Sequence, residues 1–224
     1  FQGESSGSAD GFVVRVDPSR QALDAIDRGT FLGGSGIDFV YAIHLGANEV
    51  VHATGYTTSD NFPTAGNAPQ TRFGGIADAF VARIDHTIPG RGQLTFSTYW
   101  GGAGTDIAYG LAVETGGRVH IPGYTYSFEF PVTSNALQSR FGGGAHDAFL
   151  ASFNPALPAS EAAIYSSYWG GEGVELGSAL ATDNNCNVHA TGTTSDTRMQ
   201  LQGAFQPSNN GLPDAYMATI NVCQ

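Results

Sequence analysis

The chain has 224 residues, of which 31 are glycine, 13% are charged and 11% are aromatic. This composition is typical of short strands joined by tight turns rather than of helices, and it favours an all-β fold. The formal net charge of −11 argues against nucleic acid as a partner, because an acidic surface repels phosphate backbones. No apolar segment approaches the roughly 20 residues of a membrane-spanning helix, so we expect no membrane insertion.

The chain opens with what we interpret as the last strand of a repeat. Residues 1–17 contain GSADGFVVRVD, in which Phe12, Val14 and Val16 alternate with other residues in the period of a strand. The earlier strands of this unit are not in the sequence. We therefore expect 12–17 to be the outer strand of a preceding unit and the sequence to be part of something longer.

Three landmarks recur along the chain at intervals of 67 to 69 residues. One is a Gly-Gly pair, the second is a histidine in segments such as VVHATGYT and RVHIPGYT, and the third is an aspartate that opens segments such as DAFVARID. The pairs begin at Gly33, Gly101 and Gly170, the histidines are His52, His120 and His189, and the aspartates are Asp10, Asp78, Asp147 and Asp214. Landmarks that stay in step indicate a repeat protein.

Three full units then cover residues 29–85, 94–154 and 163–222, with polar connectors at 18–28, 86–93 and 155–162. Each unit has four strand-like segments, which we place in the middle unit at 94–100, 107–114, 118–125 and 147–153. The Thr115-Gly116-Gly117 turn requires antiparallel neighbours. Four-stranded antiparallel units joined by short links are the blades of a β-propeller. A β-solenoid is the alternative, although its coils are shorter and usually parallel.

We therefore predict one domain, residues 1–224, that is an all-β β-propeller or propeller segment with three full four-stranded blades plus the last strand of a preceding blade. Propellers typically have four to eight blades, so this ring is incomplete. Further blades of a longer parent chain, or other protein chains, would complete it. Pro122 falls inside a predicted strand and cannot donate a ladder hydrogen bond, which predicts a bulge or strand end there.

The middle unit carries Tyr99-Trp100-Gly101-Gly102, then Asp106, LAVETGGRVHIPGYT, Phe130-Pro131 and Asp147-Ala148-Phe149. This ordered set resembles the SBBP family of bacterial β-propeller repeats, found in secreted and cell-surface proteins. The resemblance covers essentially the whole chain and implies a propeller fold and an extracellular or cell-surface location, but no particular activity. The third unit departs most from the pattern, with Glu175 in place of the aspartate and Thr197-Arg198-Met199 in place of Phe-Pro.

Cys186 and Cys223 are the only cysteines. In an antiparallel unit the start of the third strand lies beside the end of the fourth, where these two residues fall. We therefore predict a disulfide between them, which would close a loop in an oxidising location. The alternative is two unpaired thiols in a reducing compartment.

The repeated polar residues raise the question of metal binding. Equivalent positions on successive blades are carried apart, so we do not expect the three histidines to share an ion and predict that they fill half-buried positions. Acids follow each Gly-Gly pair at Asp38, Asp106 and Glu175, and we expect them, with the aspartates that open the fourth strands, to accept backbone N–H bonds and fix turns. The alternative is calcium held by these carboxylates and loop carbonyls. We thus predict no cofactor, with calcium as the alternative.

The remaining candidates are aromatic. Tyr99, Trp100, Tyr168 and Trp169 close the first strands of two units, and we expect them to pack between blades; the alternative is that some stack on sugars. No catalytic constellation can be assembled from the sequence. We expect a non-enzymatic extracellular or cell-surface module for protein–protein interaction or structure. The alternatives are a carbohydrate-binding, lectin-like propeller that binds a surface glycan, and a segment of a secreted propeller enzyme.

Overall fold

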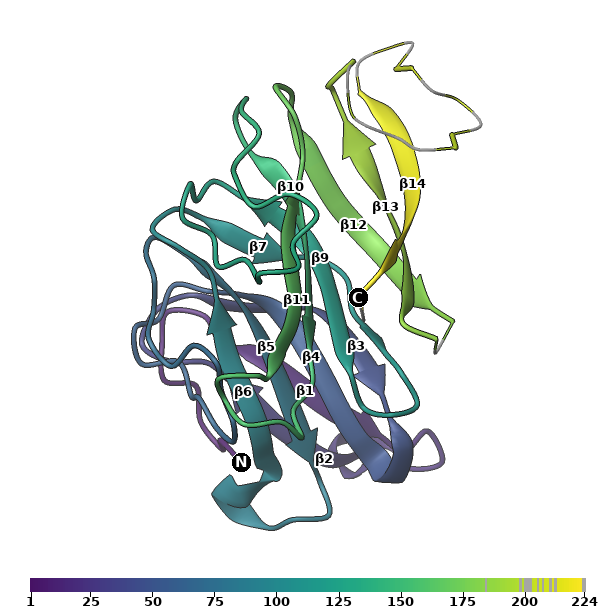
Figure 1. Cartoon of the computed structure of the whole chain (residues 1–224). Helices are drawn as coiled ribbons and strands as arrows, with labels where there is room; N and C mark the ends of the chain where they lie inside the picture. Colours follow the sequence, from purple (N-terminus) through teal and green to yellow (C-terminus); the bar gives the residue numbers. More distant parts are fainter. Residues whose placement is uncertain are drawn as a thin grey trace.

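The computed structural model describes residues 1–183, 185–197, 199, 203, 204, 206, 208, 209, 211 and 213–222. Within them the fold is all-β, as predicted: fourteen strands form four antiparallel sheets, and the described residues contain three short 3-10 turns but no α-helix. The sheets follow one another in chain order, from purple to yellow in Figure 1.

Each sheet is built from strands that are consecutive in the chain. The first sheet contains β1 (Gly11–Val16) and β2 (Ile26–Leu32), and the second contains β3 (Asp38–Leu45), β4 (Val50–Thr57), β5 (Asp78–Asp85) and β6 (Leu94–Trp100). The third contains β7 (Asp106–Ala108), β8 (Ala112–Val113), β9 (Val119–Thr125), β10 (Asp147–Phe153) and β11 (Ala163–Trp169). The fourth contains β12 (Glu175–Thr182), β13 (Asn187–Thr194) and β14 (Asp214–Asn221). The 3-10 turns are η1 (Ala22–Ala25), η2 (Ala47–Glu49) and η3 (Gly90–Gln93).

The sheets are offset by one strand from the units predicted at 29–85, 94–154 and 163–222. Strand β6, predicted to open the middle unit, pairs instead with β5 of the unit before it, so that Trp100 lies opposite Ala79. Strand β11 pairs in the same way with β10, and Trp169 lies opposite Ala148. The connectors at 86–93 and 155–162 are therefore hairpin links inside a sheet. The alternating pattern of a strand does not reveal which neighbour it pairs with, and this is why the sequence placed the boundary wrongly.

The same offset is found at the start of the chain, where the expectation for the first strand was wrong. Strand β1 was expected to be the outer strand of its unit, but β2 pairs along it from Gly11 opposite Leu32 to Val16 opposite Ile26. The last residues of the predicted connector 18–28 thus belong to β2. In the first sheet β2 therefore holds the place that β6 and β11 hold in the next two sheets.

Pro122 lies within β9, where its pairing with Leu150 of β10 is in regular register. On the opposite side, β9 pairs with β7 as far as Ala108 and with β8 from Ala112 onwards. The ladder is thus interrupted in the stretch that faces Pro122. The second and fourth sheets are irregular at the same place, opposite Thr54 and Thr191, so the interruption does not depend on the proline. The predicted irregularity is confirmed, and it lies in the strand beside the proline.

The hydrophobic core lies between successive sheets. Trp100 of β6 packs edge-on to Phe153 of β10, with ring centroids 5.0 Å apart, between the second and third sheets. Tyr99, the neighbouring residue on β6, lies in the core shared by the first and second sheets. Trp169 of β11 contacts Tyr216 of β14 at 5.1 Å between the third and fourth sheets. The prediction that these aromatic residues pack between neighbouring units is confirmed.

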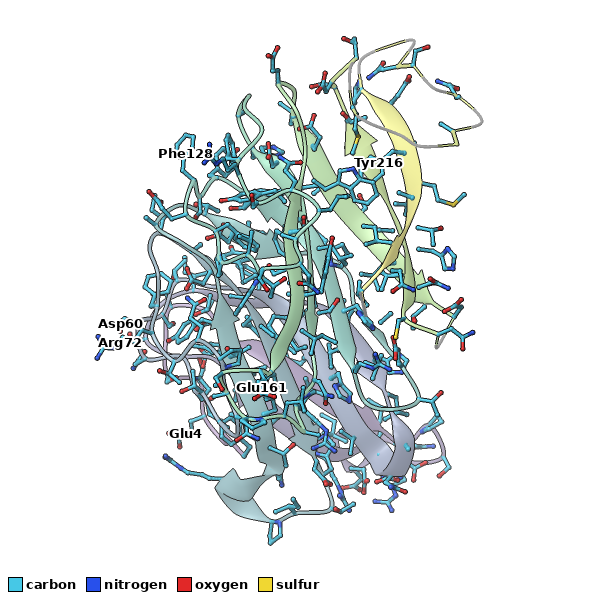
Figure 2. The ribbon with its side chains drawn as sticks, viewed as in Figure 1. Glu4, Asp60, Arg72, Phe128, Glu161 and Tyr216 are labelled. Carbon is cyan, nitrogen blue, oxygen red and sulfur yellow. The ribbon has the colours of Figure 1, made fainter. Side chains whose placement is uncertain are left out.

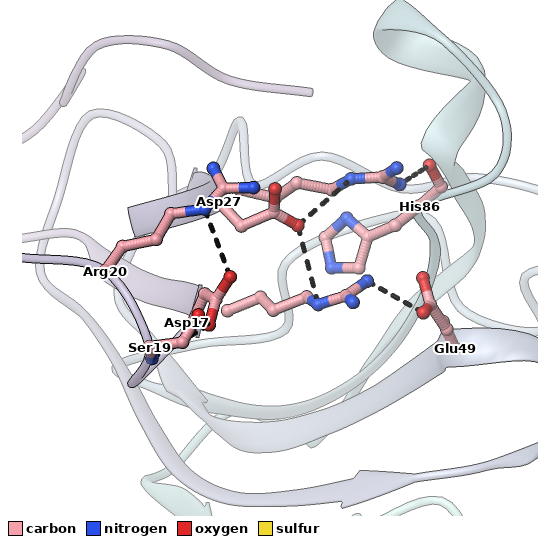
Figure 3. Close-up of polar contacts among 8 residues, drawn as sticks. Asp17, Ser19, Arg20, Asp27, Glu49 and His86 are labelled. Atoms are coloured by element: carbon pink, nitrogen blue, oxygen red, sulfur yellow. Dashed lines mark hydrogen bonds and ion pairs between the residues drawn. The ribbon is translucent and has the colours of Figure 1, made fainter. Parts of the chain in front are cut away.

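A group of ion pairs at the surface connects the first sheet to the second (Figure 3). Arg15 of β1 binds Asp27 of β2 at 3.5 Å and Glu49 of η2 at 2.7 Å. Arg28 of β2 donates a hydrogen bond of 2.5 Å to the carbonyl oxygen of His86. Because these side chains are partly solvated, each pair adds little stability.

The chain crosses from one sheet to the next at residues 33–38, 101–106 and 170–175, and we call each crossing a joint. Every joint begins with a Gly-Gly pair and ends with an acid that opens the next sheet. The backbone N–H of that acid donates to a carbonyl oxygen of the sheet before it. The bonds run from Asp38 to Ala9 at 2.7 Å, from Asp106 to Ala77 at 2.7 Å and from Glu175 to His146 at 3.2 Å.

The geometry of the joint predicts that its first glycine cannot be replaced by a residue with a side chain without loss of stability. A Cβ atom on Gly101 would lie 2.7 Å from carboxylate oxygens of both Asp78 and Asp106. We expect Gly101→Ala to lower the free energy of unfolding by about 1–3 kcal/mol, because buried carboxylates must move to relieve the contact. Urea denaturation measures this effect. The control is Gly116→Ala, whose Cβ would meet nothing within 4 Å; equal losses in both variants would contradict the prediction.

Candidate functional site

The joints contain the most regular polar clusters of the molecule. In the second joint, Asp106 accepts a hydrogen bond from Gly102 N at 2.8 Å and from Ser127 Oγ at 2.9 Å, and its other oxygen accepts the Thr125 hydroxyl. Asp106 is fully buried. Burial raises its pKa to about 6, although these hydrogen bonds oppose the increase.

The other two joints repeat this arrangement with small changes. Asp38 accepts bonds from Gly34 N at 2.8 Å, from Ser59 Oγ at 2.9 Å and from the Thr57 hydroxyl. Glu175 accepts bonds from Gly171 N and Thr194 Oγ1, both at 3.0 Å, while Asp196 replaces the serine and accepts Glu172 N at 3.2 Å. The predicted structural role of these acids, accepting backbone N–H bonds, is confirmed.

A second acid enters each joint from the preceding sheet. Asp78 Oδ2 accepts Gly74 N at 2.8 Å and Gln70 Nε2 at 3.1 Å. Its Oδ1 is buried without a hydrogen-bond partner and faces Gly101, on whose other side Asp106 lies. Burial raises the pKa of Asp78 to about 7, and the negative charge of Asp106 adds to the increase. Burial also raises the pKa of Asp147, the equivalent residue in the third joint, to about 6.

Calcium binding at these acid pairs stays an untested alternative. Calcium takes six to eight oxygen ligands, whereas most carboxylate oxygens of a joint already accept N–H and O–H bonds. Over the ranges that the structure describes, no three His, Cys, Asp or Glu residues are arranged to hold a metal ion.

The repeated histidines lie on three different sheets, in β4, β9 and β13. His52 is buried, and burial lowers its pKa to about 4. His189 is exposed and bonds to Thr219 of the neighbouring strand at 2.8 Å. The expectation of half-buried positions is therefore wrong in detail, because the three side chains differ in exposure while keeping the same place in the repeat.

His120 forms a hydrogen-bonded chain that has the composition of a hydrolase triad. Its Nδ1 lies 2.8 Å from Ser152 Oγ and its Nε2 lies 3.1 Å from Glu114 Oε1. However, Ser152 and His120 are fully buried and Glu114 is only 4% exposed. A substrate has no access to this serine. The hydrogen bonds of Ser152, His120 and Glu114 therefore serve to link β9 and β10 to the turn after β8.

The structure describes only one of the two cysteines of the predicted disulfide, Cys186. The carbonyl oxygen of Cys186 accepts Val222 N at 2.9 Å, so the start of β13 lies beside the end of β14, as expected. Cys186 Sγ also accepts a bond of 3.0 Å from Arg118. Cys223 lies outside the described residues, and the Cys186–Cys223 disulfide stays a prediction.

The tryptophans proposed to stack on sugars are buried. Trp100 is 6% exposed and Trp169 is 9% exposed, and both serve the cores between sheets. The alternative that these residues face a ligand is therefore wrong. Their rings are too large to leave in solvent when a neighbouring sheet can cover them.

A different aromatic surface spans the second and third sheets. We call it the aromatic row, and its members are Phe39, Tyr41, Tyr56, Tyr109, Tyr124, Tyr126 and His146. Tyr41 and Tyr109 join the two halves, with ring planes 13° apart and centroids 5.1 Å apart. Phe39, Tyr41 and Tyr126 are 42%, 44% and 45% exposed. An open groove of about 370 Å³, lined by residues of β1 and β3, lies beside Phe39 and Tyr41.

Sequence reasoning missed this row, although one signal was available. Phe39 and Tyr41 alternate in one strand and therefore share a face of the sheet, and Tyr56 is paired directly opposite Phe39. The repeat hid the signal, because the row is made from positions that differ between units. For example, the position of Tyr41 and Tyr109 is Ser178 in the third unit.

No protein-family model matches this chain, and no curated protein matches it. In the part of the chain that the structure describes, no helix is long and apolar enough to cross a membrane.

The acid pairs predict an unusual dependence of stability on pH. Asp78 has an ordinary pKa of 3.8 and a folded-state pKa of about 7. Between these values the folded protein retains a proton that the unfolded chain has released. The stability from protonated Asp78 is thus fully present below about pH 4 and is lost as the pH rises through 7.

We expect Asp78→Asn, which cannot ionise and keeps an oxygen for Gly74 and Gln70, to raise the melting temperature above pH 7 and to flatten its decline with pH. Thermal unfolding from pH 4 to 8 measures this. The control is Asp60→Asn on an exposed loop (Figure 2). Identical pH profiles for Asp78→Asn and the wild type would show that Asp78 is ionised throughout.

Proposed function

We propose that this chain is a non-enzymatic interaction or structural module of an extracellular or cell-surface protein, built as an arc of β-propeller repeats. The observation that carries the proposal is the use of the repeated polar residues. At each joint the acids, hydroxyls and glycines bind one another and the backbone. A repeat of this kind maintains an architecture and leaves its surfaces for contacts with partners.

The connectivity of the sheets supports the propeller arrangement. The second and third sheets each place four consecutive segments side by side through hairpins, and a joint then leads from the last strand to the first strand of the next sheet. Each of these first strands packs on the preceding sheet: β3 contacts β1, β7 contacts β4 and β5, and β12 contacts β9 and β10. This is the way in which successive propeller blades are joined.

The location of the titratable residues supports a role other than catalysis. Asp78, Asp106 and Asp147, whose pKa values are raised, are fully buried inside joints. Perturbed acids of an enzyme line a cleft that admits substrate. The Ser152–His120–Glu114 chain is closed to solvent as well.

Two measurements test this proposal together. Light scattering gives the mass of the native particle, which we expect to exceed the 23.3 kDa of one chain when a binding partner or further copies are present. Assays with ester, peptide and glycoside substrates should show no turnover. Turnover that disappears in Ser152→Ala would identify an enzyme and overturn the proposal.

A carbohydrate-binding surface is the second candidate function, and the aromatic row is the observation that favours it. Exposed aromatic rings on one face are suited to stacking on the apolar faces of sugars, and tyrosine hydroxyls can bond to sugar hydroxyls. The row extends over two sheets, which suits an oligosaccharide better than a single sugar.

If the aromatic row binds glycans, Tyr41→Ala should weaken binding by about tenfold, because loss of one stacked ring removes on the order of 1 kcal/mol or more. A glycan array followed by calorimetry measures this. The matched control is Phe128→Ala, whose ring is 73% exposed and lies outside the row (Figure 2). Absence of binding to any glycan, or equal losses in both variants, would remove this candidate.

A further inference from the structure

In the second sheet, the last strand is held by a glutamine clamp in addition to its ladder hydrogen bonds. Gln70 Oε1 accepts Gly101 N at 3.1 Å, and Gln70 Nε2 donates to Gly101 O at 3.1 Å. The carbonyl oxygen of Gln70 accepts Tyr99 N at 3.2 Å. One residue thus recognises the backbone of the segment Tyr-Trp-Gly that ends β6.

The first and third sheets contain the same clamp. Gln138 accepts Tyr168 N through its carbonyl oxygen at 3.1 Å and Gly170 N through Oε1 at 3.0 Å. Gln2 accepts Phe31 N at 3.0 Å and Gly33 N at 3.4 Å in the same way. The three clamps hold β2, β6 and β11, the last strands of their sheets.

A fourth clamp stands beside the fourth sheet. Gln206 Nε2 donates to Ser208 O at 3.1 Å and to Asp214 Oδ2 at 3.4 Å. Gln70 makes the equivalent bonds to Arg72 O at 3.0 Å and to Asp78 Oδ2 at 3.1 Å. Gln206 therefore already has the pose of an occupied clamp, yet among the described strands β14 pairs only with β13.

The face of β14 beside this edge is also uncovered. Met217 is 80% exposed, whereas the equivalent residues Val81 and Leu150 are 0% and 1% exposed. In the second and third sheets a glutamine holds the last strand and the strand before it is covered. In the fourth sheet the glutamine is in place, but among the described residues no last strand pairs with β14 and Met217 is exposed. An open strand edge with a hydrogen-bonding clamp at its end is suited to binding another strand.

We infer that the edge of β14 and Gln206 form a binding site for an extended peptide segment of the pattern serine or threonine, tyrosine, tryptophan, glycine, glycine. The inference deepens the proposed interaction module by naming the chemistry of its partner. The register follows from β5–β6 and β10–β11: the tryptophan lies opposite Ala215, the tyrosine opposite Tyr216 and the hydroxyl residue opposite Met217. The segment runs antiparallel to β14.

The contacts in the other sheets explain why this pattern is recognised. Tyr99 and Tyr168 donate their hydroxyls to the carbonyl oxygens of Ser59 at 2.9 Å and Ser127 at 2.8 Å. Asp196 occupies the position of these serines in the fourth sheet, so its carbonyl group is placed to accept the tyrosine hydroxyl of a bound segment. A Cβ on the first glycine would lie 2.7 Å from Oδ1 of the strand-opening aspartate, as at Gly101 and Gly170.

The occupant is an unpaired segment and not the folded surface of a second copy. Within one copy, β2, β6 and β11 carry the pattern or a close variant of it, and all three are already paired along their sheets. Releasing one of them would expose its buried rings to water. A free segment has no strand pairing to give up, and its cost on binding is the ordering of the segment and its lost translational and rotational freedom.

The test uses the intact chain and a fluorescein-labelled peptide, Lys-Lys followed by LTFSTYWGG, whose last nine residues are those at 94–102. Fluorescence anisotropy should show saturable binding. The peptide LTFSTYWAG with the same tail should bind at least about tenfold more weakly, because its alanine meets Asp214. Gln206→Ala should weaken binding of the first peptide by about fivefold or more.

Gln206 is exposed, so its replacement should leave the far-ultraviolet circular dichroism and melting temperature unchanged. Gln21→Ala, at an exposed glutamine whose side chain makes no cap bond, is the matched control and should bind like the wild type. Equal binding of the two peptides, or unchanged binding by Gln206→Ala, would overturn the inference.

Self-association of the chain that Met217→Arg abolishes would also overturn it, because a second copy would then cover the edge. If the peptide fails to bind while the native particle still contains a partner, this site is removed and the interaction module stands. Catalytic turnover would remove the proposed function without deciding peptide binding. The two proposals therefore fail on different measurements.

Discussion

The structure depends on one confined glycine in each joint. The first glycine of a Gly-Gly pair lies against two carboxylates, one from the sheet that the chain is leaving and one from the sheet that it enters. Only a residue without a side chain fits there. In the second joint, the second carboxylate accepts the N–H of the second glycine and the hydroxyls of Thr125 and Ser127 at the end of β9. The position of the first glycine therefore determines where the next sheet begins.

This arrangement has an energetic cost in the second and third joints. A buried carboxylate loses its hydration, and two of them near one another repel. Protonation of one partner relieves the repulsion, as the raised pKa of Asp78 indicates. The aromatic cores offset the rest, since Tyr99 and Trp100 face different cores and bury both faces of the strand that leads into the joint. The polar residues of a joint determine where the chain crosses to the next sheet, and the apolar residues beside the joint stabilise that crossing.

The functional proposals follow from what this scaffold leaves uncovered. The repeated acids, histidines and tryptophans are engaged inside the structure or within single sheets, so interaction with a partner falls to positions outside the repeat pattern or at its margin. The aromatic row belongs to the first class, because its side chains differ between units. The edge of β14 belongs to the second class, because among the described residues no last strand pairs with β14 as β6 and β11 pair in the second and third sheets.

The sequence by itself determined the all-β class, the repeat, the turn at Thr115-Gly116-Gly117 and the structural role of Asp38 and Asp106, since these depend on local pattern and backbone chemistry. Only the tertiary structure decided that Leu94–Trp100 pairs backwards with Asp78–Asp85, because either neighbour satisfies the same alternation of side chains. It also decided that Trp100 is buried while Tyr41 is exposed. Burial depends on which sheet lies against a face, and sequence spacing does not contain that information.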